Sequence, residues 1–101
     1  MSDLADVQID EKIKVTTREP GKYKVVMLND DKTPMQFVIE VLMQVFKHNG
    51  EVAENITMSI HSEGSGVAGV YPHEIAEQKS HETLTLSKGH GFPLRVKVEK
   101  E

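Results

Sequence analysis

An apolar run that breaks off at three polar residues, just before a helix-start signal, constrains this chain more than any other feature. The run, residues 23–28, suits a strand, and an Asn-Asp-Asp triplet at 29–31 follows it directly. Residues 33–36, Thr-Pro-Met-Gln, match a capping box, in which Thr33 would accept a backbone hydrogen bond and the glutamine would reach back. Pro34 would then be the first helical residue. The sequence thus predicts a strand, a tight polar turn and a helix in direct succession.

The polar turn is predicted to form the lip of a binding site. Asn29 and Asp30 supply acceptors on the turn, and apolar Met35 and Val38 come just beyond it. Acceptors beside apolar surface suit a cation that is attached to a hydrophobic group. Taken alone, however, such a turn more often satisfies its own backbone, and the apolar residues are more often core. The pattern by itself leaves both interpretations open.

Length and composition define the general class of protein. The 101 residues suit one domain that can bury roughly 60–70% of its unfolded surface. A formal net charge of −4, without a basic cluster, argues against nucleic acid as the main partner. The sequence has no cysteine and no run of about 18 apolar residues that could span a membrane. We therefore expect a cytoplasmic protein with neither nucleic acid nor a membrane as its partner.

Hydrophobic spacing and turn residues predict the first half of the chain. Residues 1–21 are acidic and poor in large apolar residues, which predicts a flexible N-terminal extension. Residues 22–101 would form the folded domain. Apolar residues at helical spacing predict helices at about 34–47 and 51–61. Between them, the glycine of Asn49-Gly50 would end the first helix.

Two strands and one helix are predicted in the second half. Residues 67–70 suit a short strand, and a third helix would run from residue 72 to about 87 because two glycines follow. The alternation at 83–86 would also permit a strand. Residues 92–98 alternate as a last strand. The order β-α-α-β-α-β predicts an α+β two-layer sandwich, a three-stranded antiparallel sheet with helices packed on one side.

The residues around the turn resemble the signature of the ClpS adaptor family. The resemblance is carried by residues 23–39 (YKVVMLNDDKTPMQFVI), Ile60-His61, residues 69–71, residues 74–79 and Pro93-Leu94. It covers about residues 22–100, and its separated motifs occur in the same order. Proteins of that family recognise N-terminal degrons and deliver their substrates to an AAA+ unfoldase. The flexible N-terminal extension would reach into the unfoldase during delivery.

The resemblance implies roles for particular residues. Asn29, Asp30 and His61 would bind the free α-amino group and first peptide unit of a substrate. The first side chain, typically Phe, Tyr, Trp or Leu, would enter a pocket. The residues implied for that pocket are Asp31, Thr33, Met35, Val38, Thr57, Ile60 and Leu94. Glu74 and Lys79 would dock the adaptor, expected to be a monomer, on the N-terminal domain of a ClpA- or ClpC-type unfoldase.

The sequence departs from the family pattern in two places. Many members have a methionine where this chain has Thr57, with Met58 beside it. The smaller, polar residue should leave the pocket wall wider and wetter, and would mark a divergent paralogue with altered substrate choice. The stretch 83–88 is polar and matches the family poorly.

Other functions follow less well from the same residues. An enzyme would use His61 with Asp30 or Asp31 as acid–base partners, but the sequence has no nucleophile elbow, metal motif or phosphate-binding loop. The five histidines lack ligand spacing, so neither a metal nor another cofactor is expected. A protein-interaction domain of the same fold, which modulates a Clp unfoldase without binding N-degrons, is the alternative. Glu74 and Lys79 could also be ordinary residues of a solvated helix face.

Overall fold

In the computed structural model, which describes residues 21–101, the elements follow the predicted order β-α-α-β-α-β. Their bounds are β1 Lys22–Leu28, α1 Met35–Gln44, α2 Gly50–Glu63, β2 Ser65–Pro72, α3 His73–Gly89 and β3 Arg95–Lys100. The predicted α+β fold with a three-stranded antiparallel sheet is confirmed. The predicted N-terminal extension, apart from Gly21, lies outside the described residues. Within the described range, no helix has the length and apolar character needed to cross a membrane.

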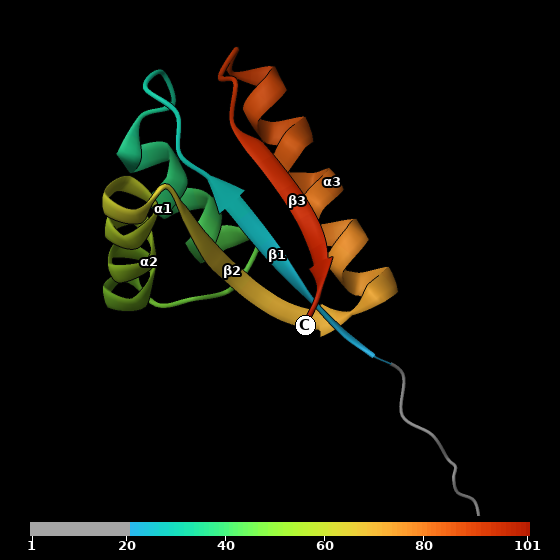
Figure 1. Ribbon diagram of the computed structural model, residues 1–101. Coiled ribbons are helices and arrows are strands. Elements are labelled where there is room, and N and C mark those ends of the chain that lie inside the picture. The colour runs from blue at the N-terminus through green and yellow to red at the C-terminus, as the bar shows by residue number, and fades with distance from the viewer. Residues whose placement is uncertain (1–20) are drawn as a thin grey trace, which may run out of the picture.

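β1 is the central strand, with β2 on one edge and β3 on the other, both antiparallel to it (Figure 1). This position explains its apolar run, because Val25 and Met27 are 0% exposed in the core and Val26, on the other face, is 6% exposed. The register with β2 shifts between Val25 and Val26, where Ala68 is the extra residue of a bulge. The 29–31 turn therefore follows directly from the central strand and lies at the end of the sheet.

The helices bury two different kinds of face. The buried residues of α1 are Phe37, Val38, Val41 and Leu42, whereas those of α3 are the small residues Ala76, Ser80, Thr83 and Ser87. The Thr83 hydroxyl donates to the carbonyl of Lys79 (2.9 Å), and the Ser87 hydroxyl donates to that of Leu84 (3.2 Å). These bonds satisfy polar groups in the core. Residues 83–86 are therefore helical, and the strand alternative is excluded.

The predicted capping box at the start of α1 is wrong. Pro34 is the N-cap and not the first helical residue, since its carbonyl accepts the N–H groups of Phe37 (3.1 Å) and Val38 (3.3 Å). Thr33 does not cap the helix, because its N–H and its hydroxyl both donate to the carboxylate of Asp30. A capping box would have paired the N–H of Thr33 with the side chain of Gln36, but the charged carboxylate of Asp30 is the stronger acceptor and takes this N–H instead.

The boundary between α1 and α2 also differs from the prediction. α1 ends at Gln44, and the left-handed residue that turns the chain is Lys47, at φ 62°. Asn49 is the N-cap of α2, where its side chain accepts the N–H of Val52 (2.9 Å), and Gly50 is the first helical residue. Asparagine is among the best N-cap residues, so the pair starts the second helix rather than ending the first.

The last strand begins at Arg95, three residues later than predicted. Phe92 instead packs edge-on against Phe37, with ring centroids 4.9 Å apart. Leu94 is 5% exposed although it precedes the strand. The apolar residues at 92–94 that suggested a strand therefore pack in the core instead, at the end of the sheet where the 29–31 turn lies.

Candidate functional site

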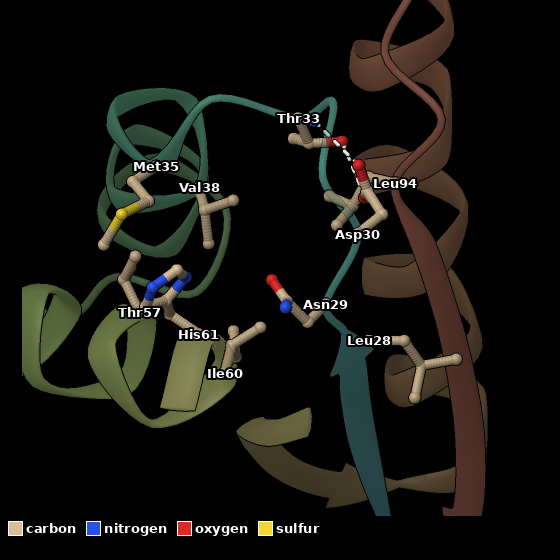
Figure 2. A pocket seen from close by; sticks show the side chains of 10 residues that line it. All are labelled: Leu28, Asn29, Asp30, Thr33, Met35, Val38, Thr57, Ile60, His61 and Leu94. Atoms are coloured by element: carbon tan, nitrogen blue, oxygen red, sulfur yellow. Dashed lines mark hydrogen bonds between the residues drawn. The ribbon is translucent and has the colours of Figure 1, made fainter. Parts of the chain in front are cut away.

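A pocket lies where the end of β1, the start of α1, the second half of α2 and the start of β3 meet (Figure 2). Its lining residues are Leu28, Asn29, Asp30, Thr33, Met35, Val38, Thr57, Ile60, His61 and Leu94. The structure thus brings together every residue predicted for the lip and the pocket except Asp31. Asp31 is exposed on the turn and does not line the pocket, so its predicted place is wrong. Leu28 lines the pocket and was not predicted.

Asp30 holds the turn that forms the lip. Its Oδ1 atom accepts the N–H groups of Lys32 (2.8 Å) and Thr33 (2.7 Å), and its Oδ2 atom accepts the Thr33 hydroxyl (2.8 Å). A second anchor is the N–H of Asn29, which donates to the carbonyl of Gly64 (2.9 Å) just beyond α2. An aspartate that bonds backbone N–H groups two and three residues ahead is a common turn device. Here the same device fixes the lip next to α2.

The surroundings of Asp30 favour its ionised form. Burial alone would raise the pKa of this carboxyl, but the hydrogen bonds from Thr33 and Lys32 and the positive charge of Arg95 outweigh burial. The pKa of Asp30 is therefore held below its ordinary value. A carboxylate oxygen can accept more than one hydrogen bond, so Oδ2 retains capacity for a further donor. The lip thus carries a negative charge at neutral pH.

The interior of the pocket is apolar and is built from several elements. Val38, Ile60 and Leu94 are 5%, 4% and 5% exposed, whereas Met35 at the rim is 39% exposed. Ile60 lies against Gly66 of β2, because a Cβ atom added to Gly66 would stand only 2.7 Å from the Cγ1 atom of Ile60. The pocket wall therefore depends on a close contact between α2 and β2 that only glycine permits.

Thr57 is part of this wall and is only 2% exposed. Its hydroxyl donates to the carbonyl of Ala53 one turn back (2.8 Å), a bond common for threonine within helices. The hydrogen of this hydroxyl is therefore already paired within α2, although its oxygen can still accept a further bond. The wider and wetter wall expected from the sequence stays a prediction.

Asn29 and His61 approach the same space from opposite sides of the pocket mouth, as Figure 2 shows. Both side chains are exposed. An amide oxygen, a neutral imidazole nitrogen and the Asp30 carboxylate can together accept several hydrogen bonds from one group with multiple N–H donors. A hydrophobic group attached to that donor would then enter the apolar pocket. Among residues 21–101, no three His, Cys, Asp or Glu side chains are grouped so as to hold a metal ion.

The two residues predicted for docking lie away from the pocket, on α3. Glu74 is exposed in the first turn of the helix. Lys79 is half-buried, with its ammonium group donating to the carbonyl of Val45 (2.7 Å) and 5.7 Å from the centroid of the Tyr71 ring. A cation at the C-terminal end of α1 is favourable for the helix dipole. Lys79 therefore ties α3 to α1, whatever else it does.

The fold and the pocket together define a small α+β binding domain, with a lip of acceptors over an apolar cavity. The model of the family described as "ATP-dependent Clp protease adaptor protein ClpS" matches residues 18–97. The chain therefore belongs to the ClpS family of Clp protease adaptors.

Similar proteins agree with this assignment. The ClpS of Desulfotalea psychrophila is 48% identical over 87 residues, which are 86% of this chain and 85% of that protein. The ClpS of Helicobacter hepaticus is 40% identical over 97 residues, 96% of this chain and 98% of that protein. The structure of Agrobacterium tumefaciens ClpS2 bound to L-phenylalaninamide superposes with a TM-score of 0.79 at 42% identity, covering 82% of this chain and all of that one.

Proposed function

We propose that the chain is a non-catalytic adaptor that binds proteins by a hydrophobic N-terminal residue, Phe, Tyr, Trp or Leu, and delivers them to a ClpA- or ClpC-type unfoldase. The observation that best supports this proposal is the position of the acceptors of Asn29, Asp30 and His61 directly at the mouth of an apolar pocket. L-Phenylalaninamide, the ligand of the similar Agrobacterium protein, combines a free amine with a hydrophobic side chain. A protein N-terminus offers the same two groups.

The energetics suit a transient adaptor. A charge-assisted hydrogen bond contributes about 1.5–3 kcal/mol net, and burial of a leucine or phenylalanine side chain adds about 1.5–3 kcal/mol. Association entropy offsets much of this sum, so a dissociation constant on the order of 10⁻⁶ M is expected. Binding of that strength retains a substrate long enough for transfer and still permits its release.

Fluorescence anisotropy with ten-residue peptides that differ only in residue one tests the specificity. Peptides beginning with Phe, Tyr, Trp or Leu should bind in the micromolar range, while those beginning with Ser, Glu or Lys should bind at least tenfold more weakly. An even profile across all first residues would refute a side-chain pocket. Failure of every peptide to bind would leave the alternative, a domain that modulates a Clp unfoldase without N-degron recognition.

Delivery requires a second surface, for which we propose the α3 face around Glu74. Charge reversal by Glu74→Lys should weaken binding to the N-terminal domain of the unfoldase and leave peptide binding unchanged, because Glu74 does not line the pocket. Lys79→Ala is a poorer test, since it also removes the bond to Val45 and should lower stability by about 1 kcal/mol. Equal unfoldase binding by Glu74→Lys and the unmodified chain would contradict this docking site.

A further inference from the structure

Methionine sulfur is the atom of this chain that mild oxidants attack most readily, because the sequence has no cysteine and no tryptophan. Residues 21–101 contain four methionines, Met27, Met35, Met43 and Met58. Met27 is 0% exposed in the core, whereas the other three side chains are 39%, 41% and 50% exposed. An oxidant in solution must reach the sulfur to react with it. We therefore expect the three exposed methionines to react and Met27 to be protected.

Of the three exposed methionines, Met35 is the one that lines the candidate pocket. It is the first residue of α1, and its side chain extends from the rim of the pocket toward α2 (Figure 2). The interior behind it is formed by the buried apolar side chains of Val38, Ile60 and Leu94. A hydrophobic group that enters this interior must pass the rim, so it would cover the thioether of Met35.

We propose that Met35 is a site of reversible oxidation, and that its sulfoxide weakens binding of the hydrophobic N-terminal residue of a substrate. The inference rests on the proposed function, because it concerns the same pocket. The oxidant is a peroxide. The Met35 sulfur attacks one oxygen of hydrogen peroxide, an S–O bond forms and the O–O bond breaks. The departing hydroxide takes the proton left on the transferred oxygen, so the sulfur is oxidised to a sulfoxide and the peroxide is reduced to water.

The sulfoxide weakens binding because it places a strong dipole where an apolar side chain packs. Its oxygen accepts hydrogen bonds from water, and a leucine or phenylalanine side chain that covers it offers no donor in exchange. Oxidation of methionine is known to disrupt apolar contacts in this way, and methionine sulfoxide reductases reverse it with two thiols, which form a disulfide and water. Since Met35 is partly exposed at the rim, only part of this desolvation cost applies, and we expect about three- to tenfold weaker binding.

Treatment of the full chain with hydrogen peroxide, followed by removal of the peroxide, tests this inference. A free-amine peptide that begins with Phe and contains no methionine is then titrated by fluorescence anisotropy, and its dissociation constant should rise about three- to tenfold. Mass spectrometry of proteolytic fragments should locate the added oxygen on Met35, Met43 and Met58 but not on Met27. A methionine sulfoxide reductase with a thiol should restore the affinity.

Two leucine variants identify the methionine that carries the effect. Met35→Leu keeps an apolar side chain of similar volume but has no sulfur at the rim. Whatever its starting affinity, its dissociation constants before and after peroxide should therefore agree within about 1.5-fold. Met58→Leu is the matched control, because it removes a more exposed thioether that does not line the pocket. It should lose affinity on oxidation as the unmodified chain does.

The outcomes separate this inference from the proposed function. If the free-amine peptide does not bind the untreated chain, the proposed function fails and the inference fails with it. Three results overturn the inference alone. These are unchanged affinity with oxygen present on Met35, an equal loss of affinity in oxidised Met35→Leu, and no oxygen on Met35 while Met43 and Met58 react.

Discussion

Replacing Asp30 by asparagine separates the charge of this side chain from its hydrogen bonds. The amide oxygen of asparagine can still accept the N–H groups of Lys32 and Thr33, which Oδ1 accepts in the structure. The amide nitrogen can donate to the Thr33 hydroxyl, which reverses the direction of the third bond. The turn should therefore persist while the negative charge at the lip disappears.

The expected loss follows from the strength of charge-assisted bonds. Such bonds contribute about 1.5–3 kcal/mol, against about 1 kcal/mol for neutral ones, so an ammonium at the lip should lose about 1–2 kcal/mol. This corresponds to about 5- to 30-fold weaker binding of a Leu- or Phe-initiated peptide. Asp30→Ala removes the bonds that hold the turn as well, and should abolish detectable binding and reduce stability by about 1–2 kcal/mol without unfolding the domain.

Fluorescence anisotropy with one free-amine peptide measures the loss, and thermal unfolding checks the fold. Asp31→Asn is the matched control, because it removes the same charge from the adjacent residue, which is exposed and does not line the pocket. Its affinity should stay within about threefold of the unmodified chain. If Asp30→Asn binds within twofold of the unmodified chain, or if Asp31→Asn loses as much, the role given to the Asp30 charge is refuted.

Three further perturbations test other parts of the site. Gly66→Ala should lower stability by about 1–3 kcal/mol and weaken peptide binding, because the added Cβ would stand 2.7 Å from Ile60 Cγ1. Gly89→Ala is the control and should be neutral or stabilising, because an added Cβ there meets nothing within 4 Å. Equal urea midpoints for Gly66→Ala and the unmodified chain would contradict the close contact at Gly66. Thr57→Met should narrow the pocket and shift its preference among first residues, because the larger side chain fills part of the wall. An identical peptide profile for the two proteins would exclude Thr57 as a determinant. Since the pKa of Asp30 is lowered in the folded protein, its stabilisation is complete above the ordinary pKa of about 3.9 and is lost as pH falls through the folded value. The difference in urea midpoint between the unmodified chain and Asp30→Asn should therefore be constant near neutral pH and shrink as the pH falls below about 4. A difference independent of pH would be inconsistent with the role of the ionised Asp30.

The order of the elements could be predicted because hydrophobic spacing is a local property. The apolar run of β1, the stripe of α1 and the alternation of β3 each identified the right kind of element. The ends of the helices were less certain, because a polar side chain near a helix end can have more than one hydrogen-bond partner. Asp30 accepts the N–H of Thr33 that a capping box would use, and Asn49 caps the helix after it instead of marking the end of the helix before it.

The pocket was predictable to the extent that its residues sit in recognisable motifs. The lip at Asn29 and Asp30 could be predicted from the turn residues themselves. The position of His61 beside that lip depends on a tertiary contact, because the Asn29 N–H donates to the carbonyl of Gly64 at the end of α2. The place of Leu28 in the pocket could not be predicted, because it follows from the pairing of Leu28 with Arg95, and the sequence does not reveal the register of the strands. The paired hydroxyl of Thr57 also required the structure, because composition alone suggests a polar wall.

The role of the lip is tested most directly by one pair of peptides, identical ten-residue chains beginning with Phe, one with a free amine and one acetylated. Acetylation removes the charge and the extra donors that Asn29, Asp30 and His61 are proposed to bind, so two or more charge-assisted bonds are lost. The free peptide should bind with a dissociation constant on the order of 10⁻⁶ M, and the acetylated peptide at least about a hundredfold more weakly. Equal binding of the two peptides would show that the pocket recognises the side chain alone, and would contradict recognition of a protein N-terminus.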